Sequence, residues 1–198
     1  MKSHILLFFA IIFLVATNKA KAQDVNQVSI FQDGIEHAIE TEGLQQLPLA
    51  KKSFSIRFYG KKYNPVTQNF YPTQIAAPTD LDQLRYFKVG TKFSEIECLS
   101  SGTGIATYSD GYKSLHVQNY GHHYLFYENE SSKRINIIDQ EGEWFKFEFR
   151  IHSIERNDRK IILTSGEVNE IYLAILTDRN QNEVIDDQEL RVVLLTLE

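Results

Sequence analysis

One segment with strict alternation of apolar and polar residues constrains the fold of this chain more than any other feature. Its apolar positions are Phe145, Phe147, Phe149 and Ile151, and the positions between them are Lys, Glu and Arg. Successive side chains of a β-strand point to opposite faces of the sheet. The pattern therefore predicts a strand with one buried face and one solvated face.

The rest of the chain also has a pattern typical of β-strands, with short apolar stretches separated by turn residues. Asp33-Gly34 is a two-residue hairpin signal between two such stretches, although the second stretch also has helical spacing. We expect about nine strands in an all-β, mostly antiparallel fold, either a two-sheet sandwich or a closed barrel. Besides the alternating segment, the candidate segments for these strands are 28–32, 35–39, 54–63, 70–77, 115–119, 122–128, 134–138, 160–164, 171–177 and 190–197.

Residues 78–100 are the least β-like part of the chain. Pro78-Thr79-Asp80 can begin a helical turn that continues through Leu81 and Leu84. We expect a short helical segment around residues 80–99. Residues 100–111 contain three glycines and few apolar residues, which predicts a loop.

The N-terminus has the features of an export signal. Lys2 precedes an unbroken apolar run over residues 5–16, and Ala20-Lys21-Ala22 forms an A-x-A cleavage site. The apolar run is shorter than the roughly 20 residues that a membrane-spanning helix needs. We expect residues 1–22 to be a cleaved signal peptide and residues 23–198 to form a single β-rich domain. The mature chain would then have no integral membrane span and would be secreted, periplasmic or located at the cell surface.

The net charge argues against one class of partner, and the cysteine count excludes an internal disulfide. The predicted signal peptide carries three lysines and no acid, so its removal changes the formal net charge from −5 to −8. Such an acidic chain is a poor candidate for nucleic-acid binding. Cys98 is the only cysteine, so no internal disulfide forms, and we expect it to be a buried small hydrophobe.

One motif near the C-terminus carries a specific chemistry. In the twelve residues 178–189, oxygen donors occupy positions 1, 3, 5, 9 and 12, and position 7 offers a backbone carbonyl. Calcium prefers six to eight oxygen ligands, and this spacing lets a loop wrap them around one ion. The candidate metal ligands are Asp178, Asn180, Asn182, Val184, Asp186 and Glu189.

These twelve residues resemble the calcium loops of EF-hand and dockerin-type proteins, and Ile185 at position 8 also suits the resemblance. The resemblance implies one structural calcium ion. It departs at position 6, where the sharp turn usually requires glycine and this chain has Glu183. The alternative interpretation is a polar turn, because Asp and Asn are common in turns.

The segments on both sides of the loop indicate what kind of site it is. Residues 171–177 and 190–197 have some helical spacing, but they are apolar all round and rich in Ile, Val and Leu. Buried strands have this composition. We therefore expect a strand–loop–strand site, and the helix–loop–helix arrangement is the alternative.

Weaker signals lie in the middle of the chain. Residues 108–127 are rich in Tyr and Phe, which can stack on sugars but are also common in strands. His116, His122 and His123 lie in the same span, but adjacent histidines of a strand point to opposite faces. We expect no zinc site there, and any ligand surface would involve loop 100–113 and this aromatic span.

The sequence supports three functional hypotheses. The first is an exported, non-enzymatic binding or interaction domain for a protein or carbohydrate partner, stabilised by calcium at residues 178–189. The second is a secreted hydrolase acting on polysaccharide or peptide, and no catalytic residues can be assigned to it. The third is a lipocalin-like barrel that encloses a small apolar ligand.

Overall fold

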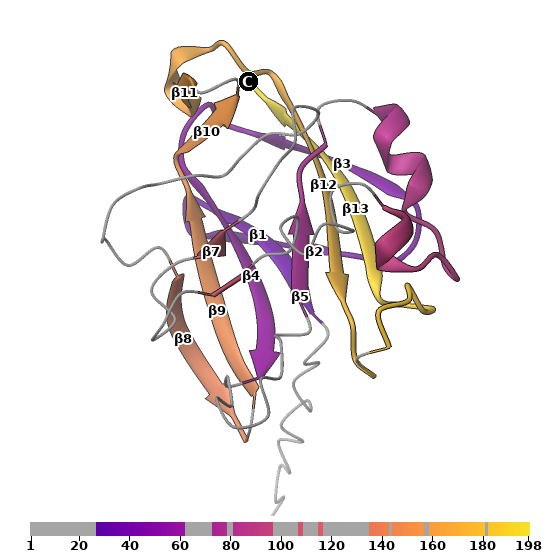
Figure 1. The fold of residues 1–198 in the computed structure, drawn as a ribbon. Coiled ribbons are helices and arrows are strands. Elements are labelled where there is room, and N and C mark those ends of the chain that lie inside the picture. The colour runs from indigo at the N-terminus through magenta and orange to yellow at the C-terminus, as the bar shows by residue number, and fades with distance from the viewer. Residues whose placement is uncertain are drawn as a thin grey trace, which may run out of the picture.

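The architecture is known from a computed structural model, shown in Figure 1. It describes residues 27–61, 73–78, 81–96, 107–108, 115–116, 135–142, 144–156, 159–180 and 182–198. The predicted signal peptide and Cys98 lie outside the described residues. In the part of the chain that is described, no helix is long and apolar enough to cross a membrane.

Five strands form the first sheet, in the order β2-β1-β4-β9-β8, and every neighbouring pair is antiparallel. β9 contains the strictly alternating segment, so Phe145, Phe147, Phe149 and Ile151 face the same side of the sheet. The five strands are β1 (Val28–Gln32), β2 (Ile35–Ile39), β4 (Phe54–Lys61), β8 (Ile135–Glu141) and β9 (Trp144–Ile151).

Four strands form the second sheet, in the order β3-β13-β12-β5. β12 and β13 are antiparallel and central, while β3 pairs with β13 in parallel at one edge. Both central strands were expected to be covered on two faces, and nearly all of their residues are buried or half-buried. The four strands are β3 (Leu44–Leu49), β5 (Thr73–Ala76), β12 (Glu170–Thr177) and β13 (Leu190–Leu197).

The main hydrophobic core lies between the two sheets. It contains the inward residues of β9, such as Phe147 and Phe149, together with Leu173 of β12 and Val193 of β13. These side chains are completely buried. The sheets therefore pack face to face, and within the described ranges they do not close into a barrel.

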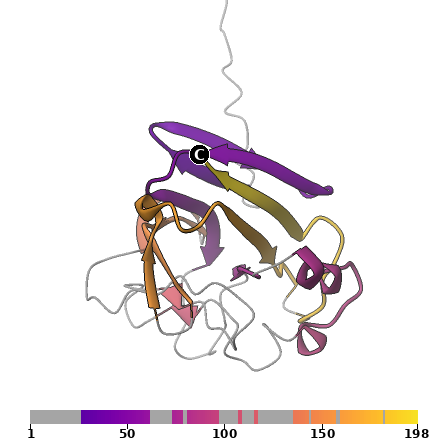
Figure 2. The same cartoon turned by 90° about the horizontal axis from the view of Figure 1, so that it is seen from above.

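A smaller apolar cluster covers the opposite face of the second sheet. Two 3-10 helices, η1 (Leu81–Tyr86) and η2 (Phe93–Glu95), lie beside β13 and the loop that precedes it (Figures 1 and 2). The predicted helical segment is thus present as short 3-10 turns. Its buried side chains pack on the sheet and join a cluster formed by Ala76, Leu84, Phe87, Phe93, Ile96, Ala174, Leu176 and Ile185.

The remaining described elements are short. β10 (Ser153–Arg156) pairs with β11 (Arg159–Ile162), and η4 (Leu163–Ser165) follows. β6 (Thr107–Tyr108) pairs with β7 (Leu115–His116). The prediction of a strand over 160–164 was therefore wrong for its last residues, which turn into η4 as the chain bends toward β12.

The first hairpin agrees with the sequence prediction. β1 and β2 pair with Gln32 opposite Ile35, so Asp33 and Gly34 form a two-residue loop. Both loop residues have positive φ, 55° and 83°. The favoured two-residue turns need this backbone, and Asp-Gly supplies it with little strain. The helical alternative for residues 35–39 is wrong.

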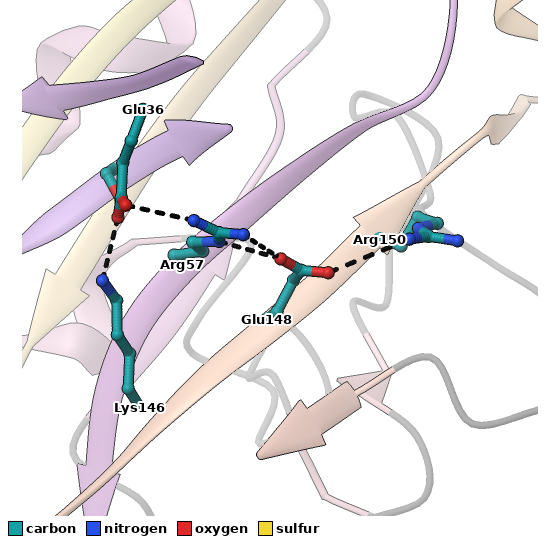
Figure 3. A network of polar contacts seen from close by, with 6 residues as sticks. Glu36, Arg57, Lys146, Glu148 and Arg150 are labelled. Carbon is teal, nitrogen blue, oxygen red and sulfur yellow. Dashed lines mark hydrogen bonds and ion pairs between the residues drawn. The ribbon is translucent and has the colours of Figure 1, made fainter. Parts of the chain in front are cut away.

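Charged side chains connect the strands on the outer face of the first sheet (Figure 3). Arg57 of β4 binds Glu148 of β9 through Nη2 and Oε2 at 2.6 Å, and Glu36 of β2 through Nη1 and Oε2 at 3.0 Å. Lys146 Nζ lies 2.9 Å from Glu36 Oε1. The Arg57 guanidinium also lies 3.5 Å from the centre of the Phe31 ring. Three strands are thus linked by one connected network.

Candidate metal centre

The candidate loop connects the two central strands of the second sheet. β12 ends at Thr177 and β13 begins at Leu190, and the two strands pair from Leu176 opposite Leu190 to Glu170 opposite Thr196. Thr177 N donates to Glu189 O at 3.0 Å and closes the base of the loop. The predicted strand–loop–strand arrangement is confirmed, and the helix–loop–helix alternative is wrong for this chain.

Two carboxylates stand at the base of the loop, and both are buried. The exposed fractions are 6% for Asp178 and 3% for Glu189. Asp178 accepts hydrogen bonds from the backbone N–H groups of Asn182 at 3.2 Å and Glu183 at 3.1 Å. Glu189 accepts from those of Arg179 at 2.8 Å and Asp186 at 3.0 Å. Each carboxylate therefore ties the base of the loop to its interior.

Three further predicted ligands converge at the tip of the loop. The side-chain amides of Asn180 and Asn182 both donate to Asp186 Oδ2, at 2.7 and 2.9 Å. Their Oδ1 atoms accept backbone N–H groups, from Asn182 at 3.2 Å and Val184 at 2.8 Å. Each amide Oδ1 has two lone pairs and accepts one of these hydrogen bonds, and Asp186 has a second carboxylate oxygen. These three side chains therefore retain capacity for a cation.

The backbone turns sharply at position 6, as the resemblance requires. Glu183 has φ = 58°, in the left-handed region, and its side chain is exposed. The bulky residue therefore does not prevent the turn. A side chain with a Cβ in this conformation costs roughly 1–2 kcal/mol.

Ile185 fixes the loop to the rest of the protein. Its side chain is completely buried in the smaller apolar cluster. Its N–H donates to Thr91 O at 2.9 Å, and its carbonyl accepts from Gly90 N at 2.7 Å. Ile185 is recognisable in the sequence as an apolar residue inside a polar loop, but no sequence pattern identifies residues 90–93 as its partner.

The loop has a strongly negative charge. Between residues 178 and 189 there are five acidic residues and one basic residue, for a net charge of −4. Arg179 uses Nη2 to bind Gln188 O at 2.8 Å. Among the described residues, no basic side chain forms an ion pair with Asp178, Asp186 or Glu189. Burying a carboxylate without a cationic partner is costly, and a cation bound at the loop would offset part of that cost.

The donors are nevertheless spread around the loop. Three or more His, Cys, Asp or Glu side chains do not gather at one point anywhere in the described residues. The carboxylates of Asp178 and Glu189 face backbone N–H groups, while that of Asp186 faces two amides. The residue types and the turn fit a calcium ion, and binding requires the carboxylates to move toward a shared centre.

Glu183→Gly should stabilise the protein even without added calcium. Glycine adopts positive φ without the Cβ penalty, although it gains entropy in the unfolded chain. We expect a net gain of about 0.5–1 kcal/mol in the free energy of unfolding, measured by urea denaturation in the presence of chelator. Glu42→Gly provides the matched control, because Glu42 is also exposed in a loop but does not have positive φ there. A gain of the same size in the control would contradict the explanation.

The other candidate positions are mostly outside the described residues. These include His122, His123, most of the loop 100–113 and most of the aromatic span 108–127. His116 and Tyr108 lie on the short paired strands β7 and β6. The described surface has an apolar groove of about 300 Å³, lined by Leu44, Leu81, Phe87 and neighbouring residues.

No protein-family model, curated protein or solved structure matches this chain.

Proposed function

We propose that this chain is an exported, non-enzymatic binding or interaction domain stabilised by one calcium ion at loop 178–189. One observation carries the calcium assignment: Asp178 and Glu189 are buried acids at the base of a loop of charge −4, and among the described residues they accept hydrogen bonds from backbone N–H groups. A cation would compensate the charge that these backbone groups only partly neutralise.

The ion would be held by side-chain oxygens of Asp178, Asn180, Asn182, Asp186 and Glu189 and by the Val184 carbonyl. Six oxygen donors on a turning loop suit calcium, which accepts flexible coordination. Magnesium requires a smaller and stricter octahedral shell, so it should bind less well. The bound ion would act as a structural cross-link between the ends of β12 and β13.

The expected affinity is low, for three reasons. Only three of the six ligands carry a charge, Glu183 occupies a strained conformation, and the carboxylates must leave backbone N–H groups to reach the ion. We therefore expect Kd of about 10⁻⁴–10⁻³ M, the range of extracellular calcium modules. That range suits an exported protein, which would meet calcium at such concentrations outside the cell.

Calcium should raise the melting temperature of the wild-type protein. At calcium about tenfold above Kd, the free energy of unfolding gains about 1.4 kcal/mol. For a domain of this size the melting temperature should rise by roughly 3–6 °C relative to the protein in chelator. Asp178→Ala should abolish the shift. Asp187→Ala is the matched control, because it removes the same charge from an exposed position of the loop that is not a predicted ligand.

The two variants separate coordination from general charge effects. If Asp187→Ala abolishes the shift as completely as Asp178→Ala does, calcium acts only by screening the negative loop. If wild type melts at the same temperature with calcium and with chelator, the loop is a polar turn and the proposed function fails.

A further inference from the structure

Loop 178–189 also anchors the backbone of residues 81–96, the segment that covers the outer face of the second sheet. Three hydrogen bonds join the two: Gly90 N to Ile185 O at 2.7 Å, Ile185 N to Thr91 O at 2.9 Å, and Phe93 N to Glu183 O at 2.9 Å. Lys92 and Val184 form an antiparallel bridge between them. Figure 2 shows the loop beside η1 and η2.

These are the links that bind the segment to the rest of the chain through its backbone. The other backbone hydrogen bonds of residues 81–96, among the described residues, are local ones, such as Phe87 N to Leu84 O and Ile96 N to Phe93 O. The segment therefore depends on residues 183–185 for its backbone anchorage.

The anchoring residues lie among the predicted ligands in the sequence. Residues 183–185 stand between Asn182 and Asp186, and Val184 is itself expected to supply a carbonyl. An ion that fixes these ligands also fixes the backbone to which residues 90–93 are bonded. Because Ile185 packs with Phe87 and Phe93, the same loop residue supports the side-chain packing of the segment.

We infer that calcium in loop 178–189 holds residues 87–96 closed over the outer face of the second sheet, and that loss of the ion lets this segment open. The inference rests on the proposed calcium site and adds its consequence. Opening would expose an apolar face that includes Leu176 and Ala174, which are buried beneath the segment. The ion would thereby control access to an apolar surface.

Linkage gives the expected size of the effect. We take the loop to bind calcium only while the segment is closed. Calcium at about tenfold above Kd then lowers the population of the open state about elevenfold. Amide hydrogen exchange of residues 87–96 should therefore slow about tenfold with calcium relative to chelator. Exchange in β8, an edge strand of the other sheet, should change by less than about twofold, because such edges open locally without the loop.

The experiment is hydrogen exchange with mass spectrometry on the full mature chain, with calcium binding measured by calorimetry on the same sample. Asp178→Ala should abolish the slowing at residues 87–96, and Asp187→Ala should retain it. If calcium binds but exchange at residues 87–96 is unchanged, the inference is overturned while the proposed function stands. If exchange slows equally in β8, calcium acts on global stability and the inference is also overturned. If no calcium binds, the proposed function fails and this inference with it.

Discussion

Ile185→Ala should lower the free energy of unfolding by about 3 kcal/mol. The side chain is completely buried and contacts both the second sheet and the segment of η1 and η2. Truncating a buried isoleucine removes apolar contacts and leaves a cavity, which costs about 2–5 kcal/mol. Urea denaturation measures the loss. Calcium affinity should fall as well, because Ile185 positions the loop between Asn182 and Asp186.

Two controls separate packing from other effects of this substitution. Ile185→Val removes one methylene group and should cost only about 0.5–1.5 kcal/mol. Ile162→Ala makes the same change at a residue that is 53% exposed and should cost less than about 0.5 kcal/mol. A loss below about 1 kcal/mol for Ile185→Ala would mean that the loop does not rely on this anchor.

Arg57→Met should lower the free energy of unfolding by about 2–4 kcal/mol. The side chains of Arg57 and Glu148 are only 15% and 10% exposed, so removal of the guanidinium leaves a nearly buried carboxylate without its main partner. Breaking a fully buried pair costs about 3–5 kcal/mol, and the residual exposure here reduces that value. Methionine preserves the packing over Phe31, so that the variant reports on the lost charge. Arg150→Met, at a residue 64% exposed and 4.0 Å from Glu148, should cost less than about 1 kcal/mol.

The penalty of Arg57→Met should also depend on pH. Partial burial disfavours ionisation of Glu36, but hydrogen bonds from Ser29 and Lys146 and the charges of Lys146 and Arg57 outweigh it, so the pKa of Glu36 is lowered from its ordinary value. A lowered folded pKa contributes stability that is present above the unfolded pKa and is lost as the pH falls through the folded pKa. The penalty should be full at pH 7 and should shrink below about pH 4. An equal penalty at both pH values would show that the charge of Glu36 does not contribute to it.

The sequence predicted those parts of the fold that local patterns determine. The alternation from Phe145 to Ile151 identified β9, and the apolar runs on both sides of the loop identified β12 and β13. Strand β3 was missed, because Leu44–Leu49 contains two glutamines and Pro48 and is a strand through parallel pairing with distant β13. An edge strand tolerates proline, so a segment such as Leu44–Leu49 can form a strand without a sequence pattern that indicates one.

The candidate site was also predicted only in part. Spacing predicts six ligands in loop 178–189, and that set stays a prediction. Glu183 was recognised as the residue in the strained position, where the structure places it with φ = 58°. The pairing of residues 183–185 with residues 90–93 was not predicted. It joins two segments far apart in the chain through backbone atoms, which carry no residue-specific signal.

Calcium titration by calorimetry tests the central claim most directly. Wild type should bind one ion per chain with Kd of about 10⁻⁴–10⁻³ M, and magnesium should bind more weakly. Asp178→Ala and Glu189→Ala should bind no measurable calcium, while Asp187→Ala should retain a single site. Absence of saturable binding in wild type at calcium about tenfold above the weakest expected Kd would contradict the assignment of loop 178–189 as a metal centre.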